Sequence, residues 1–119
     1  MGLGVYANDE RVWSASYSTF GDFRRAILEA APDYVPIPTS ELTDERIQGF
    51  WLHQPDDALA FLIEHSDCDG VILPYDAGRL ADRLEGLREA VSADWRDDID
   101  AWVSGLREAS ATKTIVEFL

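Results

Sequence analysis

Two consecutive amphipathic patterns towards the end of the chain constrain the fold more than any other feature. The first is a run of apolar side chains at i, i+4, i+7 and i+11, the spacing of one helix face: Leu80, Leu84, Leu87 and Val91. A second run with helical spacing follows it: Trp95, Ile99, Trp102, Leu106 and Ala109. Each such helix must bury its apolar face against another element. The sequence therefore predicts two helices that share one core.

The beginning of the chain is predicted to form a β-hairpin between Leu3 and Trp13. The runs Val5-Tyr6 and Val12-Trp13 flank the polar segment Asn8-Asp9-Glu10, which has turn composition. The last residues, 114–119, form another β-rich run that we expect to pair with this hairpin.

A longer helix is expected after the hairpin. Thr19 with Asp22 three residues later resembles a capping box, and Pro32 should end the helix because proline lacks a backbone N–H. Its apolar face is expected to consist of four residues: Phe20, Phe23, Ile27 and Ala30.

Two shorter helices are expected in the middle of the chain. One begins near Thr43, and the other has Pro55 in its first turn and runs through Ile63. Together these elements predict an α+β fold in which a small antiparallel sheet, the N-terminal hairpin plus the C-terminal strand, packs against about five helices. The length of 119 residues predicts a single domain over residues 1–119.

The charge of the chain narrows its range of partners. It has 23 acidic and 10 basic residues and a net charge of −13. Such a surface repels nucleic acid phosphates and anionic lipids, so we expect a basic protein partner or a cation, and neither direct nucleic acid binding nor membrane binding. A salty cytoplasm or a GC-rich genome would give the same bias without any function. One cysteine and no apolar leader favour a cytoplasmic location.

Residues 65–76 match the ligand pattern of a twelve-residue calcium loop. Asp67 and Asp69 fall at positions 3 and 5, Gly70 falls at the turn position 6, and Asp76 closes the loop at position 12. The loop lies between two expected helices, as this motif requires. Carboxylate oxygens are ligands for calcium and magnesium, so the pattern predicts a site for one of these ions.

The remaining two ligand positions are mixed in quality. Val71 would offer its backbone carbonyl at position 7, whereas His65 stands at position 1, where a carboxylate is expected. Asp76 is also shorter than the usual bidentate glutamate. A weak metal site and a purely structural turn, braced by carboxylates, are both open interpretations. Zinc is a third, although the segment has neither a CxxC nor an HxxxH pattern.

Two resemblances follow from these motifs. Residues 57–84 resemble a degenerate EF-hand. The HSDCDG segment at 65–70, followed by Ala81-Asp82-Arg83-Leu84, is similar to a group of small uncharacterised proteins, mostly from actinobacteria. The stretch at 16–24 and the closing Val116-Glu117-Phe118 are also similar to that group. This resemblance implies a shared fold and no particular activity.

The chain departs from the pattern of that group at two positions. Val71 stands where its members usually have an acidic residue, and Gly78 stands where a second cysteine often follows.

The sequence offers no strong catalytic pattern. It has no GxSxG nucleophile elbow and no glycine-rich phosphate loop. Asp67 and Asp69 flank Cys68 and would raise the pKa of its thiol, which opposes reactivity. We therefore expect a protein that is not an enzyme.

The resulting functional hypothesis is a small acidic module that neutralises or regulates a basic protein, as immunity proteins and inhibitors of defence nucleases do. Phe50 and Trp51 would serve as aromatic anchors for the partner. The alternative is a calcium- or magnesium-binding protein that uses the loop at 65–76.

Overall fold

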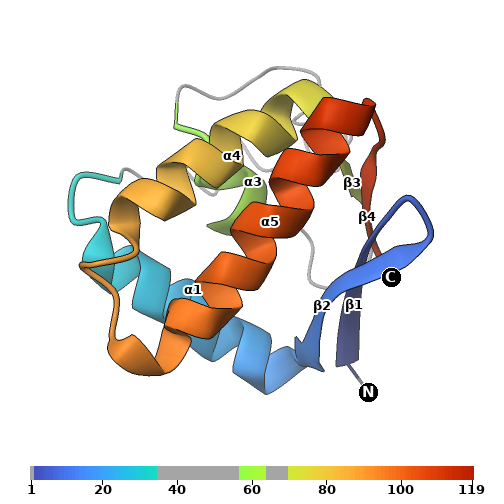
Figure 1. The fold of residues 1–119 in the computed structure, drawn as a ribbon. Helices are drawn as coiled ribbons and strands as arrows, with labels where there is room; N and C mark the ends of the chain where they lie inside the picture. The colour runs from blue at the N-terminus through green and yellow to red at the C-terminus, as the bar shows by residue number, and fades with distance from the viewer. Residues whose placement is uncertain (1, 35–56, 64–69) are drawn as a thin grey trace, which may run out of the picture.

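A four-stranded antiparallel sheet with α-helices packed on one face organises the chain in the computed structural model, which describes residues 2–34, 57–63 and 70–119 (Figure 1). The strand order is β2-β1-β4-β3. The strands are β1 (Gly2–Ala7), β2 (Glu10–Ser16), β3 (Val71–Ile72) and β4 (Val116–Phe118). The central pair joins the two ends of the described chain, because Val5 of β1 lies opposite Phe118 of β4.

The helices of the described part are four α-helices and one short 3-10 turn. They are α1 (Tyr17–Ala30), α3 (Ala60–Ile63), α4 (Pro74–Leu87), the 3-10 turn η2 (Ala93–Trp95) and α5 (Arg96–Thr112). The α+β class and the antiparallel sheet are as predicted, with slightly fewer α-helices than the expected five. The helix expected near Thr43 lies outside the described residues. No described helix is long and apolar enough to span a bilayer.

The predicted hairpin is present, and its turn explains its register. Asn8 and Asp9 both have positive φ angles, 55° and 62°, as the two central residues of a type I′ turn do. Val5 lies opposite Trp13 while Tyr6 lies opposite Arg11, so Val12 is an extra residue in β2. This β-bulge bends the strand and allows Val12 to face α5.

Helix α1 begins three residues earlier than the sequence predicted, because its N-cap is Ser16 and not Thr19. Ser16 is its N-cap, because the Ser16 hydroxyl accepts a hydrogen bond from the backbone N–H of Thr19 at 3.2 Å. Thr19 is therefore inside the helix and does not cap it. The helix ends at Ala30, before Pro32, as expected.

The expected loop at 65–76 is not a loop throughout. Val71 and Ile72 form β3, which pairs with Glu117 and Val116 of β4 and adds a fourth strand to the sheet. Helix α4 then begins at Pro74, so Asp76 lies in its first turn. A two-residue strand carries no periodic pattern, and only its long-range pairing defines it.

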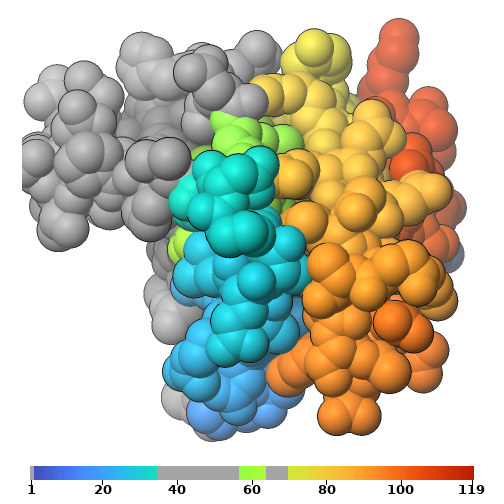
Figure 2. All heavy atoms as spheres, turned by 90° about the vertical axis from the view of Figure 1, so that its left-hand side faces the viewer, coloured from blue at the N-terminus to red at the C-terminus, as the bar shows by residue number. Residues whose placement is uncertain are grey.

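An aromatic cluster joins the sheet to the helices. The rings of Phe23 in α1 and Trp102 in α5 are stacked, with centroids 6.0 Å apart, and Trp13 of β2 lies 5.4 Å from Trp102. On the face shown in Figure 2, α1 packs against the connection between α4 and α5, where Phe23 and Trp95 have centroids 5.6 Å apart. Burial of these large rings stabilises the contact between the sheet and the helices.

Helices α4 and α5 pack closely where small residues meet. A Cβ atom added at Gly78 of α4 would lie 2.8 Å from Ser110 Oγ of α5. The opposite flank of α5 faces the hairpin, and this second contact positions the site described below.

Candidate functional site

The residues predicted to bind a metal are only partly within the described structure. His65, Asp67 and Asp69 lie outside the described residues, while Val71 lies in β3 and Asp76 in α4. The predicted aromatic anchors, at positions 50 and 51, also lie outside the described residues. Within the described ranges, no three His, Cys, Asp or Glu side chains gather as a metal-binding group.

Asp76 is the one charged residue that is fully buried in the described structure. Its Oδ1 atom accepts a long hydrogen bond of 3.5 Å from Arg79 Nη1, and its buried Oδ2 atom has no hydrogen-bond partner among the described residues. Burial raises the pKa of the Asp76 carboxyl, and the Arg79 guanidinium offsets this only in part. A buried carboxylate oxygen without a donor is a costly group that a cation would stabilise.

The backbone of Val71 is oriented away from its neighbour in the sheet. Gly70 accepts a hydrogen bond from the Phe118 N–H at 2.9 Å, and Val71 lies opposite Glu117. Antiparallel ladders alternate hydrogen-bonded and non-hydrogen-bonded pairs, so the Val71 carbonyl points away from β4.

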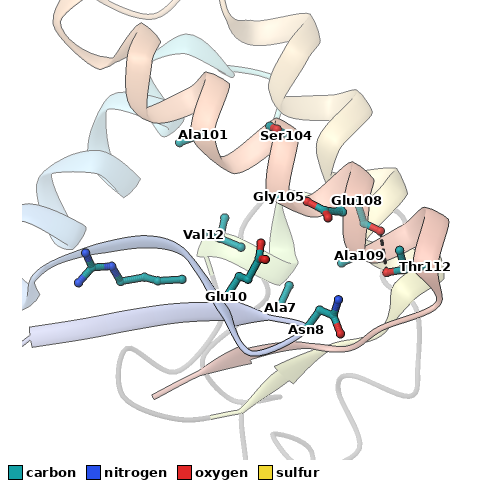
Figure 3. Close-up of a pocket in the computed structure, with 11 residues that line it drawn as sticks. Ala7, Asn8, Glu10, Val12, Ala101, Ser104, Gly105, Glu108, Ala109 and Thr112 are labelled. Atoms are coloured by element: carbon teal, nitrogen blue, oxygen red, sulfur yellow. Dashed lines mark hydrogen bonds between the residues drawn. The ribbon is translucent and has the colours of Figure 1, made fainter.

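A groove between the hairpin and α5 is a concave site of the described structure that carries acidic side chains (Figure 3). Its volume is about 240 Å³. Small and apolar residues from both elements line it: Ala7, Val12, Ala101, Gly105 and Ala109. Its polar lining comes from Asn8, Glu10, Arg11, Ser104, Glu108 and Thr112.

The groove is held by a very close contact between its two walls. A Cβ atom added at Gly105 would lie 2.3 Å from Val12 Cγ1, so only glycine allows α5 to approach β2 at this height. The Thr112 hydroxyl is fixed by a 2.9 Å hydrogen bond that it donates to the Glu108 carbonyl, one turn earlier in α5. The two walls of the groove, α5 and the hairpin, therefore contact each other directly.

Two carboxylates face each other across this groove. Figure 3 shows the side chains of Glu10 and Glu108 extending from opposite walls into the space between the hairpin and α5. Asp97 continues the acidic face of α5 beyond Ala101, because residues 97, 101, 104 and 108 share one side of the helix. All three carboxylates are in exposed residues.

The charges of the described structure are unevenly neutralised. Basic side chains around α4 and α5 are held in ion pairs: Arg79, Arg83, Arg88, Arg96 and Arg107. In contrast, Glu10, Asp97 and Glu108 have no ion pair with any other described residue. Three carboxylates without an ion pair in the described structure therefore lie on the hairpin side of α5.

Sequence reasoning did not identify this groove. The signals were present as the Asn8-Asp9 turn and as Gly105 within an otherwise regular helix pattern. Neither indicates which strand a helix flank will meet, because that depends on the tertiary contact of Gly105 with Val12. Comparisons with family models, curated proteins and solved structures found no match to this chain, so its site must be interpreted from its own geometry.

Proposed function

We propose that this protein is a non-catalytic module that binds a basic protein partner, in the manner of an immunity protein or an inhibitor. The observation that supports this proposal most directly is the set of carboxylates without ion pairs, Glu10, Asp97 and Glu108, on the hairpin side of α5. The net charge of −13 adds a long-range attraction for a basic partner. Binding of this kind requires no catalytic group.

The proposed mechanism is electrostatic steering followed by local docking. Opposite charges on two proteins raise their association rate, and salt screens this attraction over about 10 Å at 0.1 M ionic strength. Exposed carboxylates that have no intramolecular partner lose no internal ion pair when a partner's cation approaches. Binding at the hairpin side of α5 therefore breaks no ion pair of the described structure.

The test begins with isolation of partners on the immobilised protein at low salt and continues with purified components. The affinity for an isolated basic partner should fall at least tenfold between roughly 0.05 and 0.5 M salt, mainly through a slower association rate. Affinity that does not change with salt would exclude steering. If the partners that bind are acidic or neutral, the proposal is wrong.

A second candidate function, the binding of calcium or magnesium, is favoured by one specific observation. The buried Asp76 carboxylate has an oxygen atom without a hydrogen-bond partner in the described structure. Asp67, Asp69 and His65 would complete the ligand set from the segment that precedes β3. A bound cation would neutralise the Asp76 charge that burial disfavours.

Calorimetry with calcium and with magnesium distinguishes this second candidate. The wild-type protein should release or absorb heat at up to about millimolar ion, and Asp76→Asn and Asp69→Ala should abolish the signal. Asp82→Asn, on the exposed side of the same helix α4, is the matched control for loss of one negative charge. Equal heats from the wild type and Asp76→Asn would rule out a role for Asp76 as a ligand.

A further inference from the structure

The groove between the hairpin and α5 has the dimensions of a receptacle for one side chain. Its volume of about 240 Å³ lies below the roughly 300–1,000 Å³ typical of small-molecule sites. A metabolite pocket of ordinary size is therefore not formed here. A long side chain from another protein is a more suitable occupant.

The lining of the groove separates an apolar part from an acidic part. Ala7, Val12, Ala101 and Ala109 supply aliphatic surface, while Glu10 and Glu108 supply carboxylates from the two walls. A side chain with an aliphatic stem and a cationic head matches this division, because the stem can pack on apolar surface while the head remains among polar groups.

We propose that this groove seats an arginine side chain of the basic partner, an inference that rests on the function proposed above. A guanidinium group has five donors in a planar fork, so it can reach acceptors on two opposite walls at once, whereas an ammonium group is a compact point charge. Glu10 and Glu108 supply those acceptors, and Asn8 adds a side-chain amide at the hairpin end of the groove. The close contact of Gly105 with Val12 holds the two walls in place before the partner arrives.

Arg11 also lines the groove and has no ion pair with another described residue. Its positive charge opposes an incoming guanidinium. This gives the inference a second, opposite prediction: removal of the Arg11 charge should strengthen binding, while removal of the Glu10 or Glu108 charge should weaken it.

The test uses N-acetyl-arginine methylamide as the probe and observes backbone amides of the ¹⁵N-labelled protein by NMR. Saturable shifts should be confined to residues around Glu10, Ser104 and Glu108. Glu10→Gln and Glu108→Gln should each lower the affinity for the arginine probe about twofold to fivefold, the range for exposed ion pairs. Arg11→Gln should raise this affinity. N-acetyl-lysine methylamide should bind more weakly than the arginine probe.

Glu29→Gln is the matched control, because Glu29 is exposed on α1, lies outside the groove lining and has no ion pair with another described residue. It should leave the affinity for the arginine probe unchanged. Circular dichroism of each variant confirms that it is folded. Shifts spread over the whole acidic surface, an equal loss in Glu29→Gln, or equal binding of the lysine probe would each overturn the assignment.

The outcomes also separate this inference from the proposed function. If the isolated partner binds Glu10→Gln and Glu108→Gln as tightly as the wild type and with the same salt dependence, the groove is not the site but the proposed function stands. If no basic partner binds in a salt-dependent manner, the proposed function fails, and so does the assignment of the groove to a partner's arginine.

Discussion

Trp13 of β2 donates its indole N–H to Asp98 Oδ1 of α5 at 2.9 Å. This partly buried hydrogen bond joins β2, one edge strand of the described sheet, to the first turn of α5, the longest of the described helices. Trp13 is also in ring contact with Phe20, Phe23 and Trp102, so its orientation is fixed on several sides. The bond therefore helps to set the position of α5 relative to the hairpin, on which the groove depends.

Removal of this acceptor should destabilise the protein. Asp98→Ala leaves the indole N–H without its charged partner, and we expect the free energy of unfolding to fall by about 1 to 2 kcal/mol. Asp97→Ala is the control, because Asp97 lies in the same first turn of α5 but is exposed. Asp97→Ala should lower the free energy of unfolding by only about 0.3 to 1 kcal/mol, because it removes a negative charge near the positive end of the helix dipole. Urea denaturation measures both, and equal losses would mean that the hydrogen bond contributes nothing.

Gly105→Ala and Gly86→Ala should change stability in opposite directions. Alanine is favoured over glycine in a helix by about 1 kcal/mol, and a Cβ at Gly86 of α4 would meet no atom within 4 Å, so Gly86→Ala should stabilise by roughly that amount. A Cβ at Gly105 would collide with Val12, and such overpacking costs about 1 to 3 kcal/mol.

The measurement for this pair is the thermal midpoint, followed by a double-mutant cycle. Gly105→Ala should lower the midpoint, and Val12→Ala in the same chain should recover part of the loss, because it removes the colliding methyl groups. A stabilising effect of Gly105→Ala alone would show that α5 can move away from β2 without cost.

The buried Asp76 predicts a pH dependence of stability. Its folded pKa is raised above the ordinary value of 3.8, so the folded state holds the proton more tightly than the unfolded state does. The stability that this tighter proton binding contributes is therefore lost as the pH rises from 3.8 through the folded pKa. Asp76→Asn removes the charge, so the variant should match the wild type at low pH and become the more stable protein above the folded pKa. Urea titrations across this pH range test the sign, and a less stable variant at neutral pH would contradict it.

A substitution in the turn of the hairpin should make the protein more stable. Asp9 has a φ of 62°, a left-handed conformation that glycine adopts without steric cost, and the Asn-Gly pair suits a type I′ turn. Asp9→Gly should stabilise the protein by about 0.5 to 1 kcal/mol. Asp22→Gly, within α1, should instead destabilise by about 0.5 to 1 kcal/mol, because glycine has a lower helix propensity than aspartate and the substitution also removes the exposed ion pair with Arg25. Calorimetric unfolding of both variants checks this contrast.

The local elements of the fold could be predicted from periodicity and turn chemistry. The hairpin, the helix face of Phe20, Phe23 and Ile27, and the β4 strand all appear where the sequence placed them. The predicted start of α1 was wrong because Thr19 was taken as the N-cap, whereas Ser16, the last residue of β2, caps the helix. The strand β3 was missed because two residues in a ladder have no pattern of their own.

The candidate site was harder to predict than the fold. The full burial of Asp76 was not expected. The calcium-loop pattern assigns this aspartate a ligand position, but it does not give the burial of the side chain. Groove residues such as Glu10 and Glu108 lie far apart in sequence, and each is an ordinary exposed carboxylate by itself. Only the packing of α5 on β2 places them on facing walls.

The pairing of β1 with β4 has a consequence for synthesis in the cell. Because β1 is synthesised before the helices and its inner neighbour β4 after them, the hairpin has one unpaired edge while the helices are translated. Closure of so long a loop is slow compared with local helix formation. The nascent chain should therefore collapse its helices early and complete its sheet only when β4 has left the exit tunnel.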